Sequence, residues 1–194
     1  MVTLRWHLSF WLLGLGAGIS PLQAEQFISL AEAQKLCFTN ATRFEEMSFR
    51  LTREEMRAVE SHAKVKVRKP MVKAWRAWED TNLVGIVWFD QVVGKHELID
   101  YVVAINWAGE VQQVEIIAYR ENYGGQVRRR DWLNQFKGKT ASAPVSVGAD
   151  IHNITGATLS CRHITEGIKR VLAIFQQVRG RVVDAAPSGL QKHP

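Results

Sequence analysis

The stretch that decides the fold is Asp150-Ile151-His152-Asn153-Ile154-Thr155-Gly156-Ala157-Thr158-Leu159-Ser160. Asn153 and Gly156 are residue types that accept unusual backbone angles. Thr155, Thr158 and Ser160 are residue types that cap the N-termini of helices. The stretch is therefore predicted to be a tight turn that leads into a helix.

From Leu159 to Val178, apolar residues recur at about every third or fourth position, which predicts a long amphipathic helix. The start of such a helix presents unpaired backbone N–H groups at the positive end of the helix dipole, where an anion such as phosphate can bind. The other interpretation is that the threonines only cap the helix, as such residues commonly do.

The order Thr155-Gly156-Ala157-Thr158, with Asp150 before it and Leu159-Ser160 after it, resembles the Ser/Thr-Gly-Ala-Thr motif of the FMN-binding domain family. That family includes the flavin-carrying subunits of the sodium-pumping NADH:quinone reductase and of the Rnf complex. The resemblance implies that a flavin transferase, with FAD as the donor, joins FMN to Thr158 by a phosphoester bond. It also implies that the backbone from Ala157 to Ser160 holds the phosphate, and that Asp150 or Asn153 orients the loop or assists the transferase.

Two further segments carry the resemblance, which covers about residues 85 to 178. Glu121 follows a predicted strand, and a Trp…Gln-Phe-x-Gly-Lys run extends from Trp132 to Lys139. An isoalloxazine ring needs an aromatic face and hydrogen-bonding partners, which Trp132, Phe136 and Gln135 can provide. Because Trp132 and Phe136 are four residues apart, the alternative is that they form the core-facing stripe of a short helix, which shows the same spacing.

The residues before the threonine motif depart from the family pattern. Relatives often have an acidic residue two positions before the hydrophobic residue that corresponds to Ile154. This chain has His152-Asn153 there, and its acidic residue, Asp150, lies further upstream. If the transferase needs that carboxylate at a fixed distance, flavin attachment is expected to be less efficient.

Residues 1–24 have the pattern of a signal peptide. Arg5 gives a positive start, and the apolar run from Leu8 to Ile19 is shorter than the roughly 20 residues that span a bilayer. The segment ends in Pro21-Leu22-Gln23-Ala24, a plausible cleavage site. Cleavage near Ala24 predicts an exported, periplasmic protein, and a retained N-terminal anchor is the alternative.

The formal net charge of the 194 residues is +6, and it falls to +5 without Arg5. Much of the positive charge lies in Lys64–Lys69 and Arg128–Arg130. Three interpretations remain for these residues: solvated surface, an acidic redox partner, or anionic lipid headgroups. No nucleic-acid partner is expected for an exported protein. Cys37 and Cys161 have neither haem-attachment nor zinc-ligand spacing, and their pairing in a disulfide stays open.

The rest of the chain predicts one α+β domain. Capping-box patterns at Ser29 and Thr52 predict helices to about Cys37 and Ala63, whereas residues 38–49 are ambiguous. Four strands are expected to form an antiparallel meander, followed by a short helix over about residues 130–136. The strands are expected at Val72–Trp78, Leu83–Phe89, Ile99–Trp107 and Val111–Tyr119.

One face of this sheet must be covered, and the two N-terminal helices and the C-terminal amphipathic helix are the available covers. We expect a signal peptide over residues 1–24, an N-terminal helical segment packed on the same domain over 25–70, an FMN-binding domain over 71–180 and a flexible tail over 181–194.

No acid, base and nucleophile come together in the sequence, so an electron carrier is expected more than a turnover enzyme. Its partners would be a flavin transferase and a redox protein, which can be membrane-bound. The alternatives are a flavin-dependent reductase of a small acceptor and a non-redox sensory or assembly module of a respiratory complex.

Overall fold

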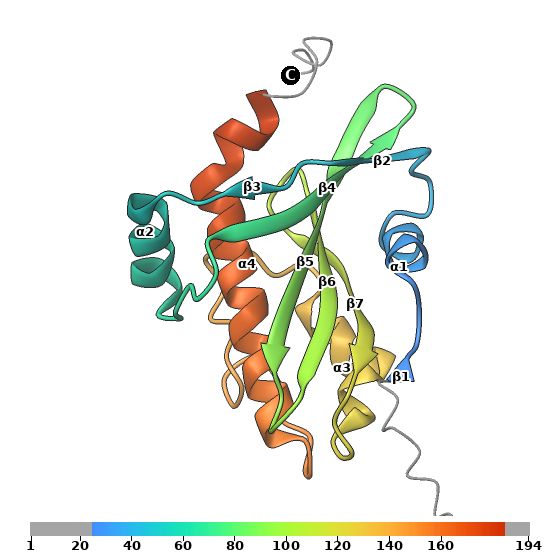
Figure 1. Ribbon diagram of the computed structural model, residues 1–194, viewed down its shortest axis with the longest axis vertical. Coiled ribbons are helices and arrows are strands. Elements are labelled where there is room, and N and C mark those ends of the chain that lie inside the picture. The colour runs from blue at the N-terminus through green and yellow to red at the C-terminus, as the bar shows by residue number, and fades with distance from the viewer. Residues whose placement is uncertain (1–24, 185–194) are drawn as a thin grey trace, which may run out of the picture.

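The computed structural model describes residues 25–184, so the predicted signal peptide and residues 185–194 of the predicted tail lie outside the described part (Figure 1). Seven strands form one antiparallel sheet in the order β1-β7-β6-β5-β4-β2, and β3 pairs separately with β4. The strands are β1 (Glu25–Gln26), β2 (Arg43–Glu46), β3 (Phe49–Arg50), β4 (Met71–Glu79), β5 (Asn82–Val93), β6 (Leu98–Asn106) and β7 (Val111–Tyr119).

The four predicted strands correspond to β4–β7, joined as the expected meander. A tight turn joins β4 to β5, and Asp80 adopts a positive φ of 52° there. The turn between β6 and β7 contains Gly109 at φ 89°, a backbone angle that glycine accepts without strain. β5 extends past the expected Phe89 to Val93, because it pairs with β6 down to the Val93–Leu98 pair.

Both predicted N-terminal helices are present and both are capped as expected. In α1 (Leu30–Cys37), Ser29 Oγ accepts from Glu32 N, and the Glu32 carboxylate accepts from Ser29 N. Thr52 and Glu55 form the same reciprocal pair at the start of α2 (Arg53–Ala63). Each box satisfies two backbone N–H groups that would otherwise lack partners at a helix start.

The helices cover both faces of the sheet rather than one (Figure 1). On one face, α2 and the long helix α4 (Thr158–Asp184) pack with residues such as Trp88 and Val103. On the other face, α1 packs with Val87 and Val102, the neighbours of those residues along β5 and β6. Because successive side chains of a strand alternate in direction, two consecutive apolar residues need cover on both sides.

A close approach between helix and sheet sets the position of α4. A Cβ atom added to Gly167 would lie 1.9 Å from Tyr101 Oη, so the glycine lets the helix backbone rest on the phenol. Tyr101 is fully buried, and burial raises its pKa well above 10, so it stays protonated and donates to Asp90 Oδ2 at 2.5 Å. Arg170, one turn further along α4, donates to the same oxygen at 2.6 Å.

The remaining elements refine the expectations. The ambiguous residues 38–49 contain β2 and the first residue of β3. The predicted helix near residue 130 is α3 (Arg130–Leu133) followed by the 3-10 turn η2 (Asn134–Phe136). A second 3-10 turn, η1 (Gly125–Arg128), precedes them. α4 continues to Asp184, so the predicted boundary at residue 180 falls inside it.

The two cysteines are both free and buried, and they pack in the cores on opposite faces of the sheet. Cys37 belongs to the α1 side and Cys161 to the α4 side. In this fold the sheet therefore separates the two thiols, and they do not form a disulfide.

Gly167→Ala should lower the free energy of unfolding by about 2 kcal/mol, because the added methyl group has to displace a buried, hydrogen-bonded phenol. The matched control is Gly180→Ala, at an exposed position of the same helix. There alanine should raise stability by up to about 1 kcal/mol, through its higher helix propensity. Urea unfolding of the two variants checks the pair, and equal effects of the two changes would contradict the account of α4.

Candidate functional site

The predicted tight turn is present immediately before α4. Ala157 N donates to Ile154 O at 3.0 Å, and Gly156, the third residue of this turn, has a φ of 85°. Such a turn favours glycine at its third position. The first backbone bond of the helix then runs from Cys161 N to Ala157 O at 2.9 Å. The N–H groups of Thr158, Leu159 and Ser160 precede that bond and point out of the helix start.

The threonine and serine hydroxyls of this segment lie in different environments. Thr158 is the first residue of α4 and is exposed, and its Oγ1 accepts from Asn153 Nδ2 at 3.1 Å. Thr155 is also exposed, in the preceding turn. Ser160 is buried and its Oγ lies 3.0 Å from Tyr119 Oη. The structure thus presents Thr158 and Thr155 to the outside and keeps Ser160 inside.

Tyr119 fixes the start of the helix against the loop that follows β7. Its hydroxyl proton is donated to Tyr123 O at 2.6 Å, so in the contact with Ser160 the serine is the donor. Gly124, at φ 86°, lies directly against this contact, since an added Cβ would be 2.7 Å from Tyr119 Oη and 3.3 Å from Ala157. Sequence reasoning did not single out Tyr119 or Gly124, and only the glycine in that loop could have drawn attention to a close approach.

The Trp132–Phe136 segment holds the backbone that precedes the threonine motif. Trp132 Nε1 donates to His152 O at 2.8 Å, and Gln135 Oε1 accepts from His152 N at 2.7 Å. Hydrogen bonds therefore hold the peptide groups on both sides of the His152 Cα atom. Phe136 is fully buried and packs edge-on against Trp132, with ring centroids 5.2 Å apart. Phe136 is thus a core residue, whereas Trp132 and Gln135 contact the loop.

Asp150 is the second fixed point of this loop. Its carboxylate accepts from Lys139 Nζ at 2.8 Å, from Ser146 N at 2.8 Å and from Val145 N at 3.2 Å. Although partial burial raises the pKa of Asp150, these donors outweigh it and hold the pKa below 3.8. Lys139, a residue type that can pair with a phosphate, is paired with Asp150 here.

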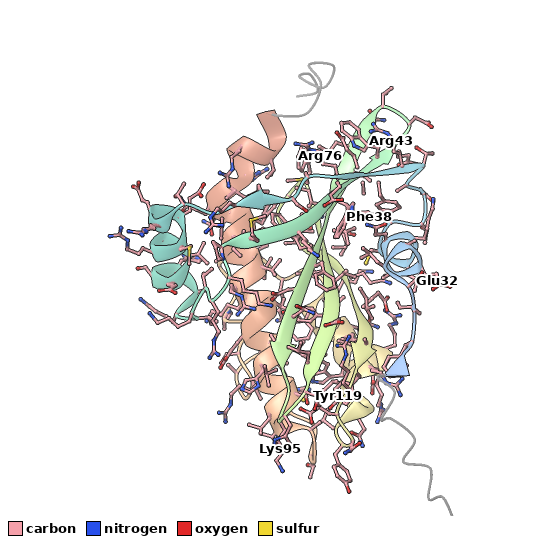
Figure 2. The ribbon with its side chains drawn as sticks, viewed as in Figure 1. Glu32, Phe38, Arg43, Arg76, Lys95 and Tyr119 are labelled. Carbon is pink, nitrogen blue, oxygen red and sulfur yellow. The ribbon has the colours of Figure 1, made fainter. Side chains whose placement is uncertain are left out.

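Glu121 lies at the same end of the molecule but serves a different loop. Its carboxylate accepts from His96 N at 2.5 Å and Glu97 N at 2.9 Å, in the turn between β5 and β6. On the other side of that turn, His163 Nδ1 lies 2.6 Å from Val93 O, which ties the hairpin to α4. Figure 2 places Lys95, in the same turn, and Tyr119 at one end of the molecule. Glu121 thus stabilises the β5–β6 turn, and its hydrogen bonds do not involve the threonine motif.

Two cavities adjoin these loops. One, of about 320 Å³, contains the predicted site residues Trp132, Gln135 and Asn153, together with His152 and Arg129 in its lining. The other, of about 670 Å³, is formed by the loop after β7 and shares Arg129 with the first. It is lined by Asn122, Tyr123, Gly124, Gly125, Gln126, Arg128 and Arg129. Both linings are rich in hydrogen-bond donors, and Asn153 joins the smaller cavity to Thr158.

No cluster of three or more histidine, cysteine, aspartate or glutamate side chains suited to a metal ion occurs within residues 25–184. The helices of this described part also include none with the length and apolar character of a membrane span.

Comparisons with known proteins point to the same part of the chain. Residues 94–173 match the model of the FMN-binding domain. The chain is 28% identical over 106 residues to a subunit of the ion-translocating oxidoreductase complex of Shewanella oneidensis, and the match covers 49% of this chain and 50% of that protein. It is 27% identical over 101 residues to the corresponding subunit of Shewanella piezotolerans, covering 46% and 48% respectively. The chain therefore spans about half the length of the curated relatives it matches.

Among solved structures, the fold is similar to that of NqrC from Shewanella oneidensis, with a TM-score of 0.52 over 80% of this chain and 100% of that chain. At 14% sequence identity this likeness concerns the fold alone. The family match begins at Gly94 in the β5–β6 turn and ends at Ala173 in α4, so it includes both cavities and Thr158. Residues 94–173 thus match the FMN-binding domain, which confirms the resemblance that the threonine motif carries.

Proposed function

We propose that this protein is an extracytoplasmic electron-transfer flavoprotein that carries FMN on Thr158 through a phosphoester bond. One observation carries the proposal: Thr158 is an exposed hydroxyl at the first position of α4, and a neighbouring amide holds its oxygen. Thr155, the other exposed hydroxyl of the motif, is in the preceding turn and has no such position on the helix.

The start of α4 suits a phosphate group. The N–H groups of Thr158, Leu159 and Ser160 precede the first helical hydrogen bond, and the helix dipole adds a partial positive charge at this end. A Cβ at Gly156 would meet no atom within 4 Å, so there is open space beside the threonine. A phosphodiester at Thr158 Oγ1 would have these amides within reach.

The adjoining cavities suit the rest of the cofactor in size and chemistry. Their volumes of about 320 and 670 Å³ lie in the range typical of small-molecule sites. Gln126 lines the larger cavity and offers a donor and an acceptor for the polar edge of a ring. Arg129, shared by both cavities, is paired with Asp131 at 2.6 Å, and Gln135 is bonded to His152 N and Trp132 O. FMN, when bound, supplies one- and two-electron transfer, and the protein determines its environment.

The attachment step uses Thr158 as the nucleophile. Its Oγ1 attacks the phosphorus of the FMN half of FAD, the bond to the AMP half breaks, and the hydroxyl proton leaves to a base of the transferase. Asn153 donates a hydrogen bond to Oγ1, which orients the side chain and leaves its proton free to depart. Asn153 directly follows His152, whose backbone is held by hydrogen bonds from Trp132 and to Gln135. The Asn153 side chain that bonds Thr158 Oγ1 therefore extends from a fixed part of the loop.

Export and partners complete the proposal. The signal-peptide pattern of residues 1–24 supports a periplasmic location after cleavage near Ala24. A covalent bond suits that compartment, because a lost flavin could not be replaced there from a free pool. The curated relatives are subunits of an ion-translocating oxidoreductase complex, which supports a membrane-bound redox partner, besides the flavin transferase.

Thr158→Ala should abolish flavin attachment, since it removes the only atom that forms the bond. After co-expression with a flavin transferase, intact-protein mass spectrometry should show the wild type heavier by the mass of FMN less one water. Thr155→Ala, the matched exposed threonine in the same motif, should keep the adduct. Loss of the adduct in Thr155→Ala but not in Thr158→Ala would reverse the assignment.

Asn153→Ala should slow flavin attachment about fivefold to tenfold, the effect of one lost hydrogen bond to the reacting hydroxyl. Its thermal unfolding should be unchanged, because the side chain is exposed. Asn134→Ala, at an exposed position in η2, is the control and should react at the wild-type rate. A time course of adduct formation measures all three proteins, and equal rates for Asn153→Ala and wild type would exclude the orienting role.

A further inference from the structure

One flank of the protein carries a group of exposed cations that no acidic residue interrupts in the sequence. Residues 61–78 contain no aspartate or glutamate and six lysines or arginines, of which Arg76 is buried and paired with Glu45. The other five are exposed and define the basic flank: Lys64, Lys66, Arg68, Lys69 and Lys73. Of the 25 lysines and arginines in the chain, Arg5 and these five leave 19, which equals the 19 acidic residues. The five charges of the basic flank thus equal in number the net charge of residues 25–194.

Four of these cations lie on the loop between α2 and β4, and hydrogen bonds fix the conformation of that loop. Lys64 ends α2 in the left-handed region at φ 55°, with its N–H bonded to Glu60 O at 2.9 Å. Val67 is buried, and its N–H donates to Glu60 Oε1 at 2.9 Å. Leu51 N donates to Pro70 O at 2.9 Å, which anchors the far end of the loop. The loop between α2 and β4, which carries four of the five cations, therefore occupies a defined place next to α2 and away from α1 (Figure 1). Lys73 follows on β4 and lies on the other face of the sheet, over the ring of Phe89.

Little of this charge is neutralised within the protein. Lys66 makes the one ion pair of the basic flank among the described residues, with Glu60 at 3.1 Å, and its side chain is 80% exposed. An ion pair so exposed contributes little. Lys69 Nζ bonds the neutral amide of Gln91 at 3.3 Å, and Lys73 lies over the ring of Phe89. The positive potential is left for a partner outside the chain.

An exposed apolar residue lies among the cations. Met71 begins β4 and is 53% exposed, whereas Val72 beside it is buried. Because side chains two apart on a strand share a face, Met71 lies on the same side as Lys73. The basic flank therefore combines exposed positive charges with an exposed apolar side chain.

We propose that the basic flank docks on the surface of an anionic phospholipid membrane. Four of its five cations are lysines, which are depleted from protein–protein interfaces, whereas arginine and aromatic residues are enriched there. Lysine is a point charge on a flexible stem and needs no bidentate geometry, which suits the diffuse charge of headgroups. Met71 can insert between headgroups while the lysines stay at their level. This docking does not depend on the proposed flavin attachment.

The test is binding of the full chain to vesicles of neutral phosphatidylcholine, with and without about one-third phosphatidylglycerol. Because residues 1–24 are apolar and can bind both kinds of vesicle, the quantity of interest is the ratio of the two partition coefficients. The variant Lys64→Gln/Arg68→Gln/Lys69→Gln should lower this ratio about a hundredfold, the combined effect of three surface charges. High salt should lower the wild-type ratio towards one.

The matched control removes three exposed cations elsewhere: Lys95→Gln/Lys137→Gln/Arg162→Gln. It should keep the wild-type ratio within about twofold, since those residues lie outside the docking surface. Thermal unfolding of both variants shows that the fold is kept. A wild-type ratio near one, or an equal loss in the control, would overturn the proposal. Binding to polyglutamate that depends on the basic flank, without preference for anionic vesicles, would assign the surface to an acidic protein instead.

Discussion

The packing of Gly167 on Tyr101 is the constraint on which the rest of the structure depends. Where a Cβ would meet the phenol oxygen at 1.9 Å, the bare backbone of α4 rests on the sheet. Asp90 accepts from both Tyr101 and Arg170, so the polar atoms at this contact are satisfied. With the helix held at that depth, its first residue, Thr158, is fixed at the end of the sheet, beside the loops that form the cavities.

The site is assembled mainly by side chains that bind backbone. Trp132 donates to His152 O, and Gln135 accepts from His152 N. Asp150 accepts from two backbone N–H groups and from Lys139. Residues that resemble a flavin-binding pattern therefore also have a structural task, which is to hold the loop that positions the hydroxyl. Such a loop is pre-organised, so little ordering remains when an anion binds at the helix start.

Local signals in the sequence were sufficient for much of the fold. The reciprocal pairs at Ser29 and Thr52 predicted two helix starts, because the capping interaction lies within four residues. Strands β2 and β3 were missed, since short edge strands are defined by pairing with β4 and not by their own pattern. The contact between Tyr119 and Ser160 joins residues 41 positions apart, and no local pattern reports it. The motif predicted Thr158, whereas the support around it came from the fold.

The central claim is that Thr158 carries the flavin, and the most direct measurement locates the modification within one peptide. Trypsin should release residues 140–162 of the co-expressed protein as one fragment, which holds several hydroxyl groups, among them those of Thr155, Thr158 and Ser160. Fragmentation by electron transfer should place the mass of FMN less one water on Thr158, because it alone is both exposed and at the helix start. The added mass on Thr155 or Ser160, or no added mass while the same transferase modifies a known substrate in parallel, would contradict the account.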